Sequence, residues 1–89
     1  MAEIKISKHA KEQMDERGIS EEMLMNIIVS PQQSIPDEPE KMIYQSVEYF
    51  AEDKREFLVR VFVNTIKQPN LVITVYRTSK IKKYWKDEN

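Results

Sequence analysis

Three segments rich in β-branched and aromatic residues follow one another in the second half of the chain and constrain its fold most. They are "KMIYQSVEYF", "EFLVRVFVN" and "LVITVYR", at residues 41–50, 56–64 and 71–77. Such compositions favour strands. The connections between them, "AEDKR" and "TIKQPN", are short, and consecutive strands joined by short connections run antiparallel. The sequence therefore predicts an antiparallel sheet over residues 41–77.

The first third of the chain predicts a helical hairpin over residues 7–30. Ser7 and Ser20 stand where N-caps belong, and Gly18 supplies the left-handed residue that ends many helices. Pro31 stops the second helix, because the residue before a proline avoids helical angles. The residues expected to pack the two helices onto the sheet are Ala10, Met14, Leu24, Ile27 and Ile28.

The remaining segments complete the expected architecture. "EIKIS" alternates apolar and polar residues and predicts a short fourth strand or an extended lead-in. Residues 31–40 hold three of the four prolines and predict a loop, and residues 78–89 predict a basic C-terminal tail. We therefore expect one domain over residues 1–89, of class α+β, with two N-terminal helices on an antiparallel sheet of three to four strands.

The amino-acid composition excludes several kinds of functional site. The chain has no cysteine, which excludes a disulfide framework, a thiolate metal site and a cysteine nucleophile. The N-terminus is charged within its first residues, and no apolar stretch approaches the length of a membrane span. A cytoplasmic protein without a membrane partner is the expectation.

The net charge of −1 hides an uneven distribution. From Glu12 to Glu40 there are eight acidic residues and one basic residue, whereas from Arg77 to Lys86 there are five basic residues and no acidic one. Such asymmetry indicates that one surface meets an anion such as nucleic acid. The alternative is a solvated basic tail whose aromatic residues pack on the sheet.

The stretch "SKHAKEQMDERGIS", followed by the proline-rich segment and a strand ending in "VITVYR", resembles the DUF4258 domain, which looks related to the RelE/ParE-like superfamily of toxins, including BrnT-type toxins. This resemblance implies two helices against an antiparallel sheet and, in the toxin relatives, cofactor-free and metal-independent cleavage of messenger RNA, often at the ribosome. It also implies a cognate antitoxin. RelE-type nucleases are generally basic, whereas this chain has a computed isoelectric point near 5.8.

Cleavage of RNA without a metal needs a base, an acid, and cations for the charge on phosphorus. The site is expected where Arg60 converges with the segment from Arg77 to Tyr84, since this segment concentrates cations and aromatic rings. The catalytic candidates are Arg77, Lys80, Tyr84 and His9, and the RNA-binding candidates are Arg60, Lys82, Lys83 and Trp85.

Two of these residues have structural alternatives. Arg60 is equally well explained by an ion pair with an acidic neighbour such as Glu48. His9 is the only histidine, so a multi-histidine metal site is excluded, and its ring is better explained as an anchor for the helix start than as a catalyst.

Three functional interpretations remain open. The first is a toxin of the RelE/ParE type that cleaves messenger RNA. The second is a non-catalytic toxin-fold domain that binds RNA or a protein partner, and the third is a small structural module. The expected partners are a cognate antitoxin and RNA or the ribosome, and the chain is expected to be a monomer or a homodimer.

Overall fold

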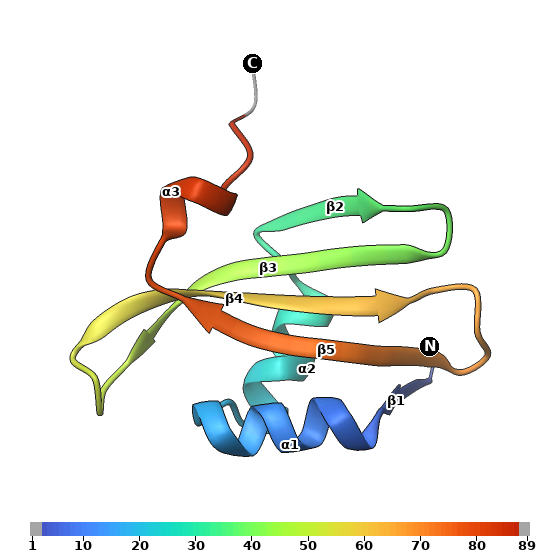
Figure 1. Ribbon diagram of the computed structural model, residues 1–89, viewed down its shortest axis with the longest axis horizontal. Helices are drawn as coiled ribbons and strands as arrows, with labels where there is room; N and C mark the ends of the chain where they lie inside the picture. The colour runs from blue at the N-terminus through green and yellow to red at the C-terminus, as the bar shows by residue number, and fades with distance from the viewer. Residues whose placement is uncertain (1–2, 88–89) are drawn as a thin grey trace.

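A computed structural model of the protein describes residues 3–87 (Figure 1). It is an α+β fold with one five-stranded sheet in the order β1-β5-β4-β3-β2. None of the helices in this range is long and apolar enough to cross a membrane. The elements are β1 (Ile4–Ile6), α1 (Lys8–Arg17), α2 (Glu21–Val29), β2 (Gln33–Asp37), β3 (Lys41–Phe50), β4 (Arg55–Asn64), β5 (Asn70–Thr78) and α3 (Ile81–Tyr84).

The predicted antiparallel meander is present as β3, β4 and β5, each paired antiparallel with the next along the chain. The register places Lys41 opposite Asn64 at one end of the β3–β4 pair and Phe50 opposite Arg55 at the other. Between β4 and β5 the register shifts once, at Phe62 and Val63. The short connections therefore dictated the pairing as expected.

The sheet is nevertheless larger than predicted and mixed rather than wholly antiparallel. β1 pairs in parallel with β5, and Ser7, which follows it, donates its backbone N–H to Val72 O at 3.0 Å. A parallel pair needs a long connection between its strands, and the two helices, β2, β3 and β4 provide it here. A three-residue strand carries no signal for a partner so distant in sequence.

Two further segments are more ordered than predicted. Within residues 31–40, predicted as a loop, Gln33–Asp37 forms β2 and pairs antiparallel with β3. This strand contains Pro36, which is tolerated because β2 lies at the edge of the sheet, where a missing N–H need not break a ladder bond. Residues 78–89, predicted as a tail, contain the short helix α3.

The helical hairpin forms with the predicted caps. The Ser7 hydroxyl accepts a hydrogen bond from Ala10 N at 3.1 Å, and the Ser20 hydroxyl accepts one from Met23 N at 3.0 Å. Gly18 ends α1 with φ of 67°, the left-handed conformation that glycine adopts without a steric penalty. The local sequence thus fixes both helix starts and the turn between them.

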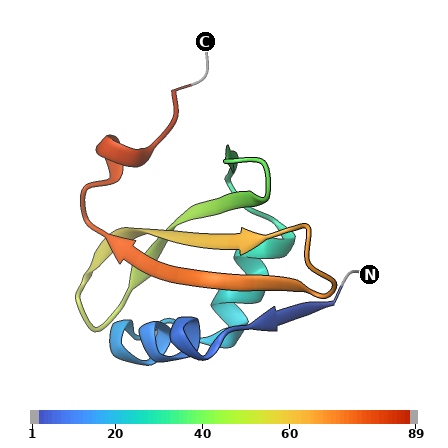
Figure 2. The same ribbon diagram turned by 45° about the vertical axis from the view of Figure 1, so that its right-hand side comes forward.

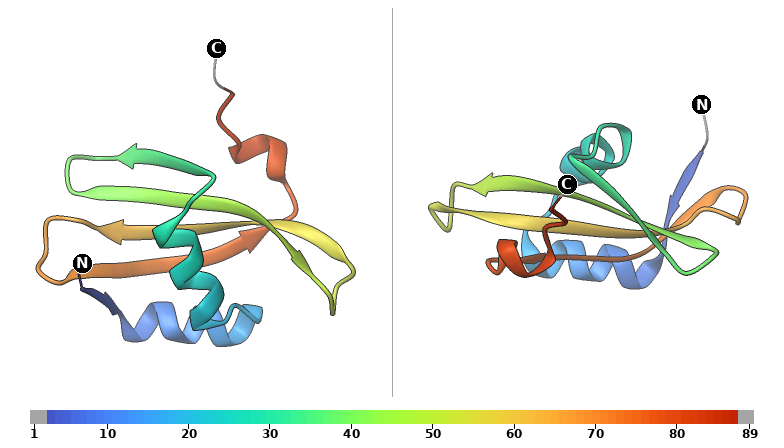
Figure 3. Two further views of the ribbon diagram at one scale, coloured as in Figure 1. Left: turned by 180° about the vertical axis from the view of Figure 1, so that it is seen from behind. Right: turned by 90° about the horizontal axis from the view of Figure 1, so that it is seen from above.

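The three helices among residues 3–87 lie at three different places around the sheet (Figures 2 and 3). α2 crosses one face, which we call the back face, whereas α3 lies over the opposite, front face. Of the predicted packing residues, Ala10, Met14, Leu24 and Ile27 are buried and Ile28 is partly buried against them. The buried core cluster consists of Ala10, Met14, Ile19, Leu24, Ile27, Phe50, Val59, Val61, Val63, Val72 and Val75.

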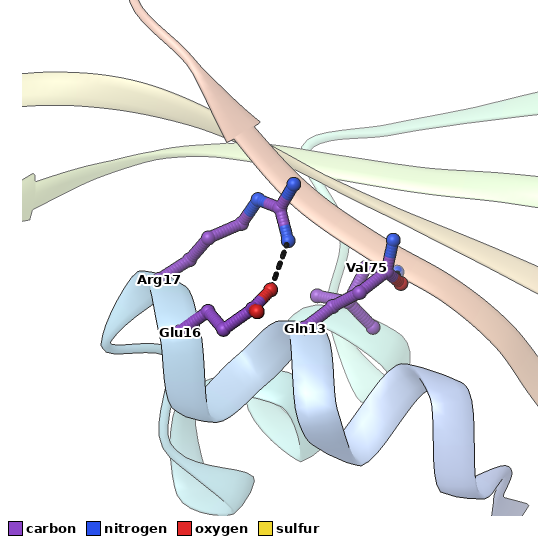
Figure 4. Close-up of polar contacts among 4 residues, drawn as sticks. All are labelled: Gln13, Glu16, Arg17 and Val75. Atoms are coloured by element: carbon purple, nitrogen blue, oxygen red, sulfur yellow. Dashed lines mark hydrogen bonds and ion pairs between the residues drawn. The ribbon is translucent and has the colours of Figure 1, made fainter.

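α1 runs along the outer edge of β5, beyond the short pairing with β1 (Figure 4). The Gln13 side-chain oxygen accepts a hydrogen bond from Val75 N at 2.9 Å, and the Ser7 hydroxyl lies 3.4 Å from Ile73 O. Arg17, in the last turn, also reaches toward β5, with its Nη1 3.7 Å from Glu16 Oε1. Side chains of α1 therefore satisfy backbone groups that a bare strand edge would expose.

Candidate anion-binding site

Four polar side chains form a row across four strands on the front face. Gln33 of β2 is opposite Gln45 of β3, Gln45 is opposite Arg60 of β4, and Arg60 is opposite Tyr76 of β5. Directly opposed residues project to the same face of a sheet, so the register alone aligns them. We call Gln33, Gln45, Arg60 and Tyr76 the polar row.

Hydrogen bonds connect the polar row from end to end. Gln45 Nε2 donates to Gln33 Oε1 at 2.7 Å, Arg60 Nε donates to Gln45 Oε1 at 2.8 Å, and Arg60 Nη1 donates to the Tyr76 hydroxyl at 2.9 Å. Gln45 is fully buried, and Gln33 and Arg60 are each 9% exposed. Because buried polar groups need partners, each member holds the next in place.

The C-terminal segment is fixed on top of this row through its main chain. Gln45 Nε2 donates to Tyr84 O at 3.1 Å, and Gln33 pairs with both backbone groups of Lys86, donating to its oxygen at 2.6 Å and accepting from its nitrogen at 3.1 Å. The segment predicted as a tail is therefore docked on the front face, because two buried amides supply its hydrogen-bond partners.

Arg60 is a buried cation surrounded by rings and amides. Its guanidinium carbon lies 4.6 Å from the ring centroid of Tyr84 and 5.4 Å from that of Phe62. Among residues 3–87, no carboxylate forms an ion pair with it. The pairing with Glu48 that the sequence suggested is wrong, because Glu48 is opposite Phe57 and projects to the other face of the sheet from Gln45.

One terminal nitrogen of Arg60 has no partner among the described residues. Nε and Nη1 are engaged by Gln45 and Tyr76, whereas Nη2 has no hydrogen-bond partner among residues 3–87. Buried arginines are usually paired, since an unpaired charge in a protein interior is costly. The arrangement can therefore accept an anion at the free end of the guanidinium.

Arg77 lies on the opposite face from Arg60. It is opposite Val59, a core residue of the back face, and its Nη1 donates to Asp53 Oδ2 at 2.8 Å. The Phe50 and Phe57 ring centroids lie 4.2 and 4.3 Å from its guanidinium carbon. The expected convergence with Arg60 is therefore wrong for Arg77, because consecutive strand residues alternate faces, and it is right for Tyr84.

The lysines of the C-terminal segment surround α3. Lys80 precedes this helix, Lys82 and Lys83 lie within it, and all three are exposed. Lys83 Nζ lies 5.4 Å from the Tyr84 ring centroid, and Trp85 is partly buried directly after the helix. The structure thus places Tyr84 beside Arg60, whereas Lys80, Lys82, Lys83 and Trp85 lie in or next to α3 on the front face without a described contact to Arg60.

His9 lies apart from this cluster. Its side chain is exposed on the first turn of α1, which begins beside Val72, whereas α3 follows Thr78 at the far end of β5. Among residues 3–87 its ring makes no hydrogen bond, and Ser7 anchors the helix start to the sheet instead. The structure therefore places His9 neither beside Arg60 nor in the anchoring position.

Sequence reasoning missed the two glutamines that organise the site. Gln45 lies between Ile43 and Val47 at the spacing of one strand face, and this polar residue between two apolar ones was the available signal. Gln33 carried no signal, because it lies in the proline-rich segment that was predicted as a loop. Among residues 3–87, no group of three His, Cys, Asp or Glu side chains gathers where it could hold a metal ion.

These features define the chain as a small α+β domain in which a buried arginine on one face of a mixed sheet pairs with no carboxylate among residues 3–87. Residues 6–77 match the model of the family described as Domain of unknown function (DUF4258), and the chain belongs to that family. The matched region ends before α3. No curated protein and no solved structure matches the chain.

Proposed function

We propose that this domain binds the phosphate backbone of RNA on the front face of its sheet, as a non-catalytic relative of the RelE/ParE-like toxins. The observation that carries the proposal is the buried Arg60 guanidinium, which has no carboxylate partner and an Nη2 without a hydrogen bond among residues 3–87. A phosphate oxygen supplies the negative charge and the acceptor that this group lacks.

The polar row prepares Arg60 for this role. Gln45 and Tyr76 fix Nε and Nη1, so the remaining donors point in one direction before a ligand arrives. The Tyr84 ring over the guanidinium restricts it further. A preorganised cation binds an anion better than a free side chain, because little conformational entropy is lost on binding.

Exposed lysines extend the contact beyond one phosphate. Lys80, Lys82, Lys83 and Lys86 lie along the segment that crosses the front face, and all are exposed. Lysine ammonium groups on flexible side chains can contact successive phosphates of an RNA backbone without recognising the base sequence. The acidic surface of residues 12–40 repels phosphate, which directs RNA to the front face despite a net charge of −1.

Binding is favoured over cleavage because the predicted catalytic groups do not gather. Arg77 is on the back face in an ion pair with Asp53, and His9 is on the first turn of α1. One observation favours the second candidate, a metal-independent endoribonuclease toxin controlled by an antitoxin: the Tyr76 hydroxyl lies 2.9 Å from Arg60 Nη1. A phenol beside a phosphate clamp can transfer a proton.

Fluorescence anisotropy with an end-labelled single-stranded RNA, at low and moderate salt, tests the binding proposal. The Lys82→Gln/Lys83→Gln double variant should bind about tenfold or more weakly and show a smaller salt dependence, since each lost phosphate contact lowers the slope by about 0.7. The matched control is Lys8→Gln/Lys11→Gln, two exposed lysines of α1. Absence of wild-type binding at low salt would refute the proposal.

The same samples separate binding from cleavage. Gel analysis of the RNA, with growth of a bacterial host expressing the chain with and without its neighbouring gene, reports activity directly. RNA that stays intact when bound supports the binding module. Cleavage and growth arrest that are lost in Tyr76→Phe, with an unchanged melting temperature, would favour the toxin instead.

A further inference from the structure

A hollow lies beside α3 on the front face, between the C-terminal segment and β3. Its volume is about 490 Å³, within the range of about 300–1,000 Å³ that is typical of small-molecule sites. The residues that line it are Val47, Ile81, Lys82, Trp85 and Asp87. Trp85 is the only tryptophan of the chain.

The lining combines apolar side chains with two opposite charges. Val47 and Ile81 are aliphatic, Trp85 contributes an indole, and Lys82 and Asp87 carry the charged groups. A mainly apolar hollow that includes an indole suits a planar ring, because any base can stack on an aromatic side chain. Lys82 attracts a phosphate, whereas Asp87 repels phosphate and attracts N–H donors, so a ligand has a preferred orientation.

We propose that this hollow binds a guanine nucleotide unit of RNA, with the base stacked on Trp85 and its phosphate near Lys82. Guanine presents two adjacent donors, the ring N–H and the exocyclic amino group, and a carboxylate accepts both at once. Adenine and cytosine present an amino group without that neighbouring donor, and uracil presents no amino group. The inference rests on the proposed function, since it names the base that accompanies the bound phosphates.

The hollow adjoins the polar row. Val47 is two residues from Gln45 on the same face of β3, a separation of about 7 Å along a strand. Trp85 directly follows Tyr84, whose ring covers the Arg60 guanidinium at 4.6 Å. A strand of RNA with its base in the hollow therefore places a neighbouring phosphate near Arg60.

Titration of the intact chain with the four nucleoside 5′-monophosphates, followed by Trp85 fluorescence, tests this site. GMP should quench the emission at lower concentration than AMP or CMP, and UMP should be weakest. Asp87→Asn should reduce the preference for GMP, Lys82→Gln should weaken all four ligands, and Lys11→Gln should leave the order unchanged. No quenching by GMP at millimolar concentration, or equal quenching by GMP and UMP, would overturn the inference.

Labelled-RNA anisotropy with Trp85→Ala separates this inference from the proposed function. Loss of stacking should weaken binding of a guanine-containing RNA by about 5- to 150-fold, the equivalent of one base–aromatic stack. If the Trp85→Ala variant keeps its RNA affinity while the Lys82→Gln/Lys83→Gln variant loses affinity, the hollow does not bind a base. The proposed phosphate site would then still be supported. Selective GMP quenching without RNA binding would support the hollow and overturn the proposed function.

Discussion

Arg60 and Arg77 lie on neighbouring strands, and both pack against aromatic rings. They project to opposite faces of the sheet, where their hydrogen-bond partners differ. Arg77, on the back face, donates to Asp53 at 2.8 Å, whereas Arg60, on the front face, has only amide, phenol and ring partners among residues 3–87. A cation with a carboxylate beside it is already neutralised. The comparison therefore supports the proposal that the front face binds the ligand, whereas the arginine of the back face belongs to the packed structure.

The largest expected effect concerns the back face, which depends on apolar packing under α2. Ile27 is 1% exposed within the core cluster, so Ile27→Ala should lower the free energy of unfolding by about 2–5 kcal/mol. Urea or thermal melts measure this change. Val29→Ala, at a position 74% exposed on the same helix, is the control. Equal melting of both variants would mean that α2 does not anchor the core.

A smaller effect is expected when the polar row is broken. Gln45→Leu conserves volume but removes the partners of Arg60 Nε, Gln33 and Tyr84 O, leaving buried polar groups unpaired. The free energy of unfolding should fall by about 1–3 kcal/mol. RNA affinity should fall as well, because Arg60 is no longer held. Gln68→Leu, in an exposed loop, is the control, and a Gln45→Leu variant with wild-type melting and binding would contradict the role of the row.

The smallest effect is expected at the Arg77 ion pair. The Arg77 and Asp53 side chains are 20% and 39% exposed, so solvent screens their attraction. Asp53→Asn should lower the free energy of unfolding by about 1 kcal/mol or less, and the difference from wild type should shrink at high salt. Melts at two salt concentrations measure this, with Asp15→Asn on α1 as the control. Loss of RNA binding in Asp53→Asn would contradict the division between the two faces.

The parts of the fold that local sequence determines were predictable. Ser7, Gly18 and Ser20 are capping signals that act within a few residues, and short connections favour the pairing of each β-rich segment with the next one. β2 was missed because Pro36 was taken as a breaker, although an edge strand accepts proline. The β1–β5 pairing was missed because it joins residues 66 positions apart, such as Ile4 and Asn70.

The proximity of two of the predicted site residues could be read from the sequence, but the face on which they lie could not. The sequence placed Arg60 with the segment from Arg77 to Tyr84, and the structure brings Tyr84, but not Arg77, to Arg60. The register between β4 and β5 decides whether Tyr76 or Arg77 lies opposite Arg60. A shift of one residue would place Arg77 there instead of Tyr76. Gln33 and Gln45 could not be recognised from their reactivity, because a glutamine amide is not reactive. It positions other side chains through hydrogen bonds.

The covering of β5 by α1 has a consequence for how the molecule behaves at high concentration. An open strand edge is a template on which identical chains can add end to end, a route to fibrils. On one side of this sheet, Gln13 occupies the Val75 N–H that an incoming strand would need. On the other side, Pro36 interrupts the donor pattern of β2. Strand addition is thus hindered in two different ways, at β5 beyond its short pairing with β1 and at β2, which lowers the tendency to aggregate even though the sheet does not close on itself.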